Sequence, residues 1–218
     1  MPGETPIQVC SSNQDVVSCD LVCDLVTKIQ YRVEVPWLKD RCEKVYSQFG
    51  EDGLIAATFE QIGTTNKHCF EVGAGDGRHL SNTRRLVELG WHAMWIENAA
   101  SKFLQMVADL PENVAAIPEK ITPENVNKIL SPLPDDMDFG VIDIDGDDYW
   151  LWKAMQKRPR VMLVEYEPLS YGHDPDVLPE RGEGQAPIKF IVELGIEKGY
   201  QLLATTFCNV LFARSDVL

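Results

Sequence analysis

A glycine-rich turn in the first half of the chain has the clearest chemical signature. The segment 68–77 reads His-Cys-Phe-Glu-Val-Gly-Ala-Gly-Asp-Gly, so an apolar strand runs into Glu71 and then into three glycines, Gly73, Gly75 and Gly77. A glycine turn between a strand and a helix lets a ligand approach bare backbone, as in nucleotide-binding βαβ units. A dinucleotide-binding turn needs its third glycine three residues after the second, and Arg78 stands there. The pattern therefore favours a different nucleotide-like ligand and argues against a nicotinamide-dependent oxidoreductase.

Acidic side chains recur at the ends of the other predicted strands. A ligand of an open α/β sheet binds beyond the carboxyl ends of its strands, so these positions carry the most information. A single acid there is usually a solvated loop residue, but five predicted strands end in this way, at Glu71, at Glu97 with Asn98, at Glu119, at Asp143 with Asp145, and at Glu165 with Glu167. Glu97 follows Glu71 by 26 positions, close to the offset of about 20 at which a strand-end acid accepts ribose hydroxyls in related folds. The sequence predicts a site for a ribose-containing ligand at one edge of a sheet.

The elements that would position these residues alternate regularly from residue 46 onward. We predict strands over 69–72, 93–97, 114–118, 139–143, 161–166, 201–205 and 210–214, and helices over 54–62, 81–90, 99–110, 123–130, 149–156 and 188–199. Such alternation predicts an α/β fold with a Rossmann-like, doubly wound sheet of seven strands, mostly parallel. The last two strands follow one another without a helix, so the last strand is predicted to pair antiparallel.

Two parts of the chain are distinguished by pattern. Residues 1–45 lack the alternation and are interpreted as an N-terminal cap or extension, with an amphipathic helix over 15–29. Residues 46–218 form the main domain, which is of ordinary size for one hydrophobic core.

Composition and charge indicate the expected compartment and exclude one class of partner. The 218 residues include 34 acidic and 20 basic side chains, a net charge of −14, without a run of lysine and arginine. Such a field repels a phosphate backbone, so duplex nucleic acid is not expected as a partner. The sequence shows neither a signal-peptide pattern nor a stretch near the roughly 20 apolar residues of a membrane span. We therefore expect a cytoplasmic protein, with its six cysteines reduced because none forms a Cys-x-x-Cys pair.

A set of short motifs resembles a known enzyme family when they are taken together. The motifs are Ser47 to Gly53, Glu71 to Gly77 with Ser81 to Thr83, Gly90 to Glu97, Ile142 to Tyr149 with Trp152 to Ala154, Pro159-Arg160, Glu165-Tyr166, and Gly199 to Phe212. Over about residues 46–214 they resemble the FkbM-type methyltransferases, a group within the class I S-adenosylmethionine-dependent methyltransferases. One motif departs from the family, because Glu167 stands where that family has asparagine, which adds a negative charge beside the expected acceptor pocket.

The resemblance implies methyl transfer from S-adenosylmethionine to an oxygen of a small molecule or sugar unit. It implies that Gly73 and Gly75 let the backbone approach the cofactor. Glu71 would hold the amino-acid end of the cofactor, directly or through water, and Glu97, with Asn98 beside it, would bind the ribose.

Four further positions of the cofactor site follow from the same resemblance. Glu119 would lie near the adenine, and Asp143 would face the methionine portion. Gln48 and Glu51 would belong to a flap over the site.

The expected reaction also needs a group that removes the acceptor proton. Asp145 is the first candidate because it follows the fourth strand and precedes Gly146, although an acid at that position could also simply favour the start of the next helix. His173, in the loop after the fifth strand, is the second candidate because the unperturbed pKa of histidine lies near neutrality.

Four carboxylates are predicted to lie close together at this edge of the sheet. Asp143, Asp145, Glu165 and Glu167 are like charges, which would raise some of their pKa values unless a cation compensates. A Mg²⁺ ion held by oxygen ligands, with Asp145 and Glu165 as candidates, would compensate and would also acidify an acceptor hydroxyl.

The alternative to an enzyme is a non-catalytic binding module that keeps the fold. Crowded carboxylates are costly to retain, which disfavours that alternative.

Overall fold

The computed structural model describes residues 33–168 and 174–218. The predicted helix over 15–29 and the candidate base His173 lie outside the described residues. At the start of the described residues, Val33 bridges to Ala204 and the Glu34 N–H donates to the Leu203 carbonyl. Leu38 is fully buried in the core. Residues from Val33 onward are thus joined to the main domain; the boundary at residue 45 stays a prediction.

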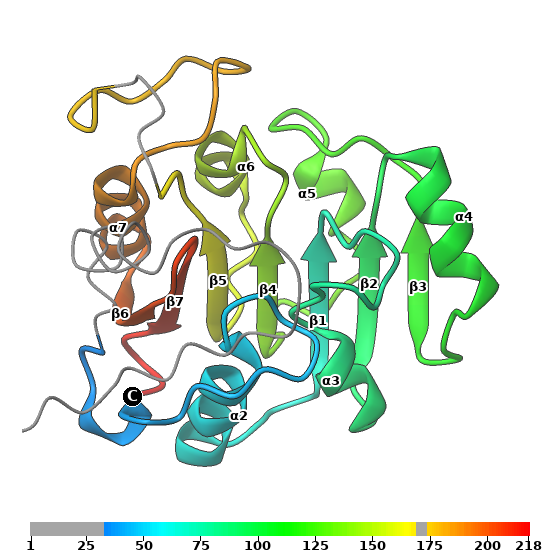
Figure 1. Cartoon of the computed structure of the whole chain (residues 1–218), viewed down its shortest axis with the longest axis horizontal. Helices are drawn as coiled ribbons and strands as arrows, with labels where there is room; N and C mark the ends of the chain where they lie inside the picture. The colour runs from blue at the N-terminus through cyan, green and yellow to red at the C-terminus, as the bar shows by residue number, and fades with distance from the viewer. Residues whose placement is uncertain (1–32, 169–173) are drawn as a thin grey trace, which may run out of the picture.

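A seven-stranded sheet forms the centre of the molecule, as predicted (Figure 1). Its strands are β1 (His68–Val72), β2 (His92–Ile96), β3 (Val114–Ile117), β4 (Phe139–Ile142), β5 (Val161–Glu165), β6 (Tyr200–Thr205) and β7 (Asn209–Arg214). Their order across the sheet is β3-β2-β1-β4-β5-β7-β6. Strands β1 to β5 run parallel, and β7 lies antiparallel between β5 and β6. The predicted antiparallel pairing of the last strand is confirmed.

Helices cover both faces of the sheet. They are η1 (Pro36–Leu38), α2 (Glu51–Ile62), α3 (Arg84–Glu88), α4 (Ala100–Ala108), α5 (Val126–Ile129), α6 (Asp148–Ala154) and α7 (Ile188–Glu197). Strand side chains alternate between the faces, so Trp95 of β2 packs in the core with α2, α3 and α4, while Ile96 packs in the core with α5, α6 and α7. None of the described helices is long and apolar enough to cross a membrane.

Helix α3 is shorter than the predicted helix over 81–90. The reason is that Ser81, Asn82 and Thr83 all donate hydrogen bonds to the Glu71 carboxylate instead of joining the helix. Short polar side chains compete with helical hydrogen bonding in this way. The same contacts bring the chain after the glycine turn back onto the end of β1.

Candidate active site

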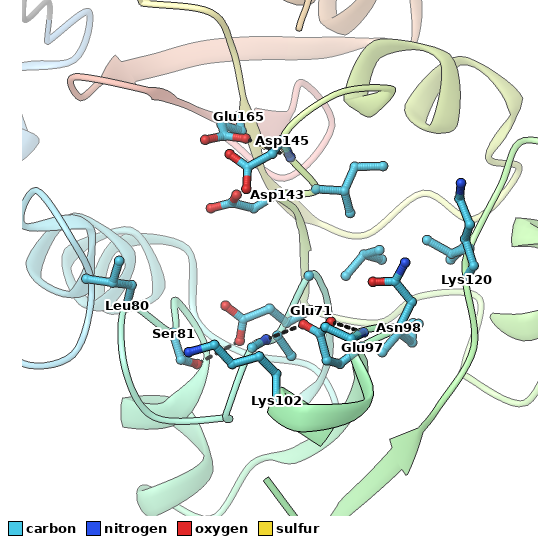
Figure 2. Close-up of a pocket in the computed structure, with 18 of the residues that line it drawn as sticks. Glu71, Leu80, Ser81, Glu97, Asn98, Lys102, Lys120, Asp143, Asp145 and Glu165 are labelled. Atoms are coloured by element: carbon cyan, nitrogen blue, oxygen red, sulfur yellow. Dashed lines mark hydrogen bonds between the residues drawn. The ribbon is translucent and has the colours of Figure 1, made fainter. Parts of the chain in front are cut away.

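A cavity of about 630 Å³ opens at the carboxyl ends of the parallel strands (Figure 2). Its volume falls in the range of small-molecule sites. The lining brings together ten of the residues singled out from the sequence: Gln48, Glu71, Gly73, Gly75, Glu97, Asn98, Glu119, Asp143, Asp145 and Glu165. They come from five different strand ends and from the segment before α2, so the strand-end argument places them correctly.

The glycines of the turn have different structural roles. All three have positive φ, +80° at Gly73, +57° at Gly75 and +72° at Gly77. A Cβ at Gly73 would lie 1.6 Å from the carbonyl oxygen of Asp143, so this glycine is needed for the turn to pack against the end of β4. A Cβ at Gly75 would meet no protein atom within 4 Å. Gly75 therefore has open space on the side where a Cβ would stand, whereas Gly73 has none; both glycines line the cavity, and their contact with a cofactor stays a prediction.

Glu71 is buried and acts within the protein as well as lining the cavity. Its carboxylate accepts hydrogen bonds from Ser81 Oγ at 2.7 Å, from the Asn82 N–H at 2.7 Å and from Thr83 Oγ1 at 2.5 Å. Burial raises the pKa of Glu71, and these hydrogen bonds oppose the rise. A carboxylate has about four acceptor positions, so Glu71 retains little capacity for direct contact with a ligand. The predicted contact through water stays a prediction.

Glu97 joins the glycine turn to the start of α4. Its Oε2 accepts the Gly75 N–H at 2.8 Å and its Oε1 accepts the Ala99 N–H at 2.7 Å (Figure 2). Each oxygen keeps a second lone pair, and both residues that it holds line the cavity. The carboxylate is thus fixed in place beside the half-buried backbone of Gly75, where the sequence predicts ribose binding.

The segment before α2 is held by an acid at the start of that helix. Asp52 Oδ2 accepts three backbone N–H groups at 2.7 to 2.9 Å, those of Val45, Tyr46 and Ser47. Ser47 Oγ in turn accepts the Asp52 N–H at 3.1 Å, so Ser47 and Asp52 hold each other. This arrangement fixes the chain that carries Gln48 into the cavity.

Glu51 differs from its expected place in a flap. It is fully buried and is not among the residues that line the cavity. Its carboxylate accepts the Phe49 N–H at 2.8 Å, Thr206 Oγ1 at 2.6 Å and Asn209 Nδ2 at 3.3 Å. Glu51 therefore anchors the Gln48 segment to the β6–β7 turn.

Three carboxyl groups lie together at the ends of β4 and β5 and point to the same side of the cavity (Figure 2). Asp143 and Glu165 share a hydrogen bond. Burial, reinforced by neighbouring carboxylates, raises the pKa of Asp143 to about 7 and that of Glu165 to about 10. The pair therefore holds a proton at neutral pH. The predicted effect of crowded like charges on pKa is confirmed.

Asp145 has an unusual backbone conformation beside this pair. Its φ is +54°, and its N–H donates to Glu165 Oε2 at 3.3 Å. Asp148 lies behind it, fully buried, where it accepts the N–H groups of Ile144 at 2.8 Å and Gly146 at 3.0 Å. Burial raises the pKa of Asp148 to about 6. The loop after β4 is thus held from within, and Asp145 is left as its exposed acid.

The expected Mg²⁺ ligands lack a third partner. Within residues 33–168 and 174–218, His, Cys, Asp and Glu side chains form no group of three or more that could hold a metal ion. The repulsion between the carboxylates of the cluster is reduced by their shared proton and by Gln185, whose amide donates to Glu165. The arrangement of Asp145 and Glu165 does not support the metal hypothesis.

Several cavity residues were not predicted. Lys102 and Lys120 line the cavity, and Gln185 contacts its carboxyl cluster. Lys120 directly follows Glu119 after β3, so the strand-end rule could have included it. Lys102 lies on α4 and Gln185 in a loop 20 positions after its partner Glu165, and no spacing in the sequence indicates either.

Comparison with known proteins identifies the fold. No protein-family model matches the sequence, and no curated protein matches it either. The structure is similar to magnesium protoporphyrin IX methyltransferase from Synechocystis PCC 6803 with bound S-adenosylhomocysteine, with a TM-score of 0.50 and 13% identity over 89% of this chain and 94% of that one. It is also similar to the N-terminal domain of EvdMO1 with the same ligand, with a TM-score of 0.51 and 14% identity over 91% and 97% of the two chains. The protein has the Rossmann-like fold of the class I methyltransferases, with β7 antiparallel in a sheet of order β3-β2-β1-β4-β5-β7-β6.

Proposed function

We propose that the protein is an S-adenosylmethionine-dependent methyltransferase that methylates an oxygen of a small molecule or sugar unit. The observation that carries the proposal is the pairing of Gly75 with Glu97. The turn presents open backbone at Gly75, and the carboxylate bonded to that backbone lies where ribose hydroxyls need an acceptor. The sheet order adds support, because a dinucleotide-binding sheet has the order 3-2-1-4-5-6 without an inserted antiparallel strand.

The cavity residues suit this cofactor. Its volume of about 630 Å³ accommodates a nucleoside with an amino-acid tail. Glu97 and Asn98 are assigned to the ribose, Glu119 to the adenine end, and Asp143 to the methionine end. The shared proton leaves Asp143 and Glu165 with at most one negative charge between them, which suits a positively charged ligand without the repulsion of two carboxylates.

The protein's chemical tasks are then alignment and proton removal. Bound S-adenosylmethionine supplies a methyl group on a sulfonium that is already activated. The cavity must hold the acceptor in line with that methyl group and exclude water. Asp145 is assigned as the general base, because it is the exposed acid of the cluster, while Asp143, Asp148 and Glu165 are less exposed and are held by hydrogen bonds.

The proposed acceptor class rests on the resemblance to FkbM-type methyltransferases. Their motifs coincide with structural features of this chain, since Asp52 and Glu51 fix the segment before α2 and Glu71 fixes the segment before α3. Glu167, the residue that departs from the family motif, lies just beyond β5, and its N–H donates to the Ala186 carbonyl. It adds negative charge on the side where the acceptor would enter.

The first test is cofactor binding by titration calorimetry. S-adenosylhomocysteine should bind with a Kd of about 1–10 µM, whereas NAD⁺ should give no heat. Glu97→Ala should weaken that binding by about 1–3 kcal/mol, since it leaves buried polar groups unmatched. Glu197→Ala, an exposed acid on α7, is the matched control and should bind normally. Binding of NAD⁺ without binding of S-adenosylhomocysteine would refute the cofactor assignment.

The second test is turnover. The protein is incubated with methyl-labelled S-adenosylmethionine and a panel of sugars, glycosides and phenols, and label transfer is counted. Transfer to a hydroxyl supports the proposal. Transfer confined to amines would refute the oxygen assignment, and tight cofactor binding without transfer to any acceptor would favour the non-catalytic module.

A further inference from the structure

Leu80 has a backbone conformation that leucine rarely adopts. Its φ is +62°, in the left-handed region, where the Cβ of an L-residue lies too close to the following carbonyl oxygen. A bulky side chain there is an outlier, and such outliers gather at ligand sites. Among the described residues, four positions other than glycine have positive φ: Asp40, Lys67, Leu80 and Asp145. Two of them, Leu80 and Asp145, line the cavity at the carboxyl ends of the strands.

Polar contacts hold the chain on both sides of Leu80. Before it, Asp76 Oδ1 accepts the His79 N–H at 2.7 Å, which closes a tight turn. After it, Ser81 Oγ donates to the buried Glu71 carboxylate at 2.7 Å. Leu80 is the single residue between these two anchored positions, so its backbone takes the conformation that joins them.

The side chain of Leu80 faces the cavity rather than the core. It is 36% exposed, whereas Val72, Ile96 and Ile121, which also line the cavity, are 1%, 1% and 7% exposed. Leu80 is the most exposed of the large apolar side chains in that lining. Glycine or asparagine would take this backbone conformation at lower cost. Packing within the protein therefore does not account for a leucine at this position.

Leu80 lies at the end of the cavity that is assigned to the amino-acid part of the cofactor. Figure 2 shows it on the side of Ser81, across the cavity from Lys120, which follows the residue assigned to the adenine, Glu119. The carboxylate of Glu71 at this end is occupied by hydrogen bonds from within the protein. The amino-acid part of S-adenosylmethionine has methylene groups between its sulfur and its charged end, and these need an apolar surface.

We propose that Leu80 packs against the amino-acid end of the bound cofactor and selects it over a nucleoside that lacks this end. The inference rests on the proposed function. A leucine side chain that is exposed in the free protein and covered by the ligand contributes the free energy of removing apolar surface from water. That contribution is absent for a ligand that ends near the sulfur. The strained backbone at Leu80 thus places an apolar side chain where the ligand can use it.

The test compares S-adenosylhomocysteine with 5′-methylthioadenosine, which has the same nucleoside and sulfur but lacks the amino-acid end. In titration calorimetry, Leu80→Gly should bind S-adenosylhomocysteine about three- to tenfold more weakly than the wild type does, because the covered apolar surface is lost. Its affinity for 5′-methylthioadenosine should stay within about twofold of the wild-type value. An equal loss for both compounds, or no loss for either, would overturn the contact.

Two further substitutions separate the apolar side chain from the backbone conformation. Leu80→Met keeps an apolar side chain of similar volume and should bind both compounds as the wild type does. Leu80→Asn suits the left-handed backbone but removes the apolar surface, so it should lose affinity for S-adenosylhomocysteine as Leu80→Gly does. Weak binding by Leu80→Met together with normal binding by Leu80→Asn would show that conformation decides the affinity, and would overturn the proposal.

Lys67→Gly is the matched control for backbone strain. Lys67 has a similar φ of +53° but precedes β1, at the edge of the sheet opposite to the cavity. Relief of the left-handed conformation should raise the melting temperature of both glycine variants by about 1–4 °C. Only Leu80→Gly should bind S-adenosylhomocysteine more weakly. A lower melting temperature in Leu80→Gly alone would show that the leucine stabilises the fold, which would overturn the argument from strain.

Failure of the Leu80 contact is distinguishable from failure of the proposed function. A wild-type protein that binds neither compound would refute the proposed function, and the contact with it. If the wild type binds both compounds and Leu80→Gly binds them equally well, only the role of Leu80 is refuted.

Discussion

Asp143 and Glu165 share a hydrogen bond between their carboxyl groups across the ends of neighbouring strands β4 and β5. Such a pair titrates as a unit, and burial keeps one proton on it at neutral pH. The relationship ties the chemistry of the site to the stability of the fold, because both depend on the same proton.

The first prediction concerns the pH dependence of stability. The folded-state pKa values of Asp143 and Glu165, about 7 and about 10, lie above the unfolded values of about 4. The native state therefore binds more protons than the unfolded chain, so the free energy of unfolding falls as pH rises from about 4 through 7 and on toward 10. Glu165→Gln cannot ionise but keeps a donor and an acceptor. Urea unfolding at pH 6 and pH 9 should show that this variant loses about 1–3 kcal/mol less than the wild type between the two conditions. An equal loss in both proteins would show that the pair does not hold the proton.

The second prediction separates ligand contact from backbone strain in the glycine turn. Gly75→Ala places a methyl group where no protein atom lies within 4 Å, at a φ of +57°, which costs about 1–2 kcal/mol. Gly90→Ala, between α3 and β2, has the same open surroundings at a φ of +84°. Both variants should lose similar stability in thermal unfolding. Only Gly75→Ala should weaken binding of S-adenosylhomocysteine, by more than about tenfold, because its methyl group would occupy the ligand's space. Normal binding by Gly75→Ala would remove this turn from the cofactor site.

The third prediction tests the general base. Asn tolerates the left-handed backbone at position 145, so Asp145→Asn should fold normally and bind S-adenosylhomocysteine with nearly unchanged affinity. Its turnover should fall by about 10²–10⁴. Chelation with EDTA should leave the wild-type rate unchanged, since the proposal assigns proton removal to the carboxylate alone. Full activity in the variant would transfer the role to another group, with His173 next in line. If EDTA abolishes turnover by the wild type and added Mg²⁺ restores it, the metal hypothesis would be supported instead.

The fourth prediction concerns a buried ion pair at the opposite edge of the sheet. Asp138 is fully buried and accepts Arg160 Nη1 at 2.7 Å together with the backbone N–H groups of Thr65, Asn66 and Lys67. Arg160→Leu leaves that carboxylate without its cation and should cost about 3–5 kcal/mol in urea unfolding. The control is Arg181→Leu, which breaks an exposed pair with Glu124 and should leave stability unchanged. A loss in Arg160→Leu no larger than in the control would mean that the backbone donors alone satisfy Asp138.

The strand-end residues could be predicted because their position depends on local pattern and topology alone. Glu97 illustrates this, since it follows a buried apolar strand and parallel strands end at one edge of the sheet. Hydrophobic periodicity is enough to locate such a residue. The alternation of strands and helices likewise predicted the sheet and the antiparallel pairing of its last strand.

Residues that depend on contacts between distant segments could not be predicted. Glu51 meets Thr206, 155 positions further along the chain, and that contact takes its carboxylate away from the cavity. Gly73 belongs to a glycine pattern, but the close approach of the Asp143 carbonyl is visible only in three dimensions. Gln185 reaches Glu165 from a loop with no periodic signal. In each case the partner is chosen by tertiary packing.

The place of β7 in the sheet has a consequence for how the chain folds as it is synthesised. The strand spans Asn209–Arg214, yet it lies inside the sheet and supplies both the neighbour of β5 and the partner of β6. Until residue 214 has left the ribosome, the hydrogen-bonding edge of β5 has no strand to pair with, and β6 has nothing to join. A nascent chain with an open, apolar strand edge is prone to mispairing and aggregation. Completion of this half of the sheet therefore waits for β7, and chaperones that shield strand edges would act on the interval between the synthesis of β5 and the insertion of β7.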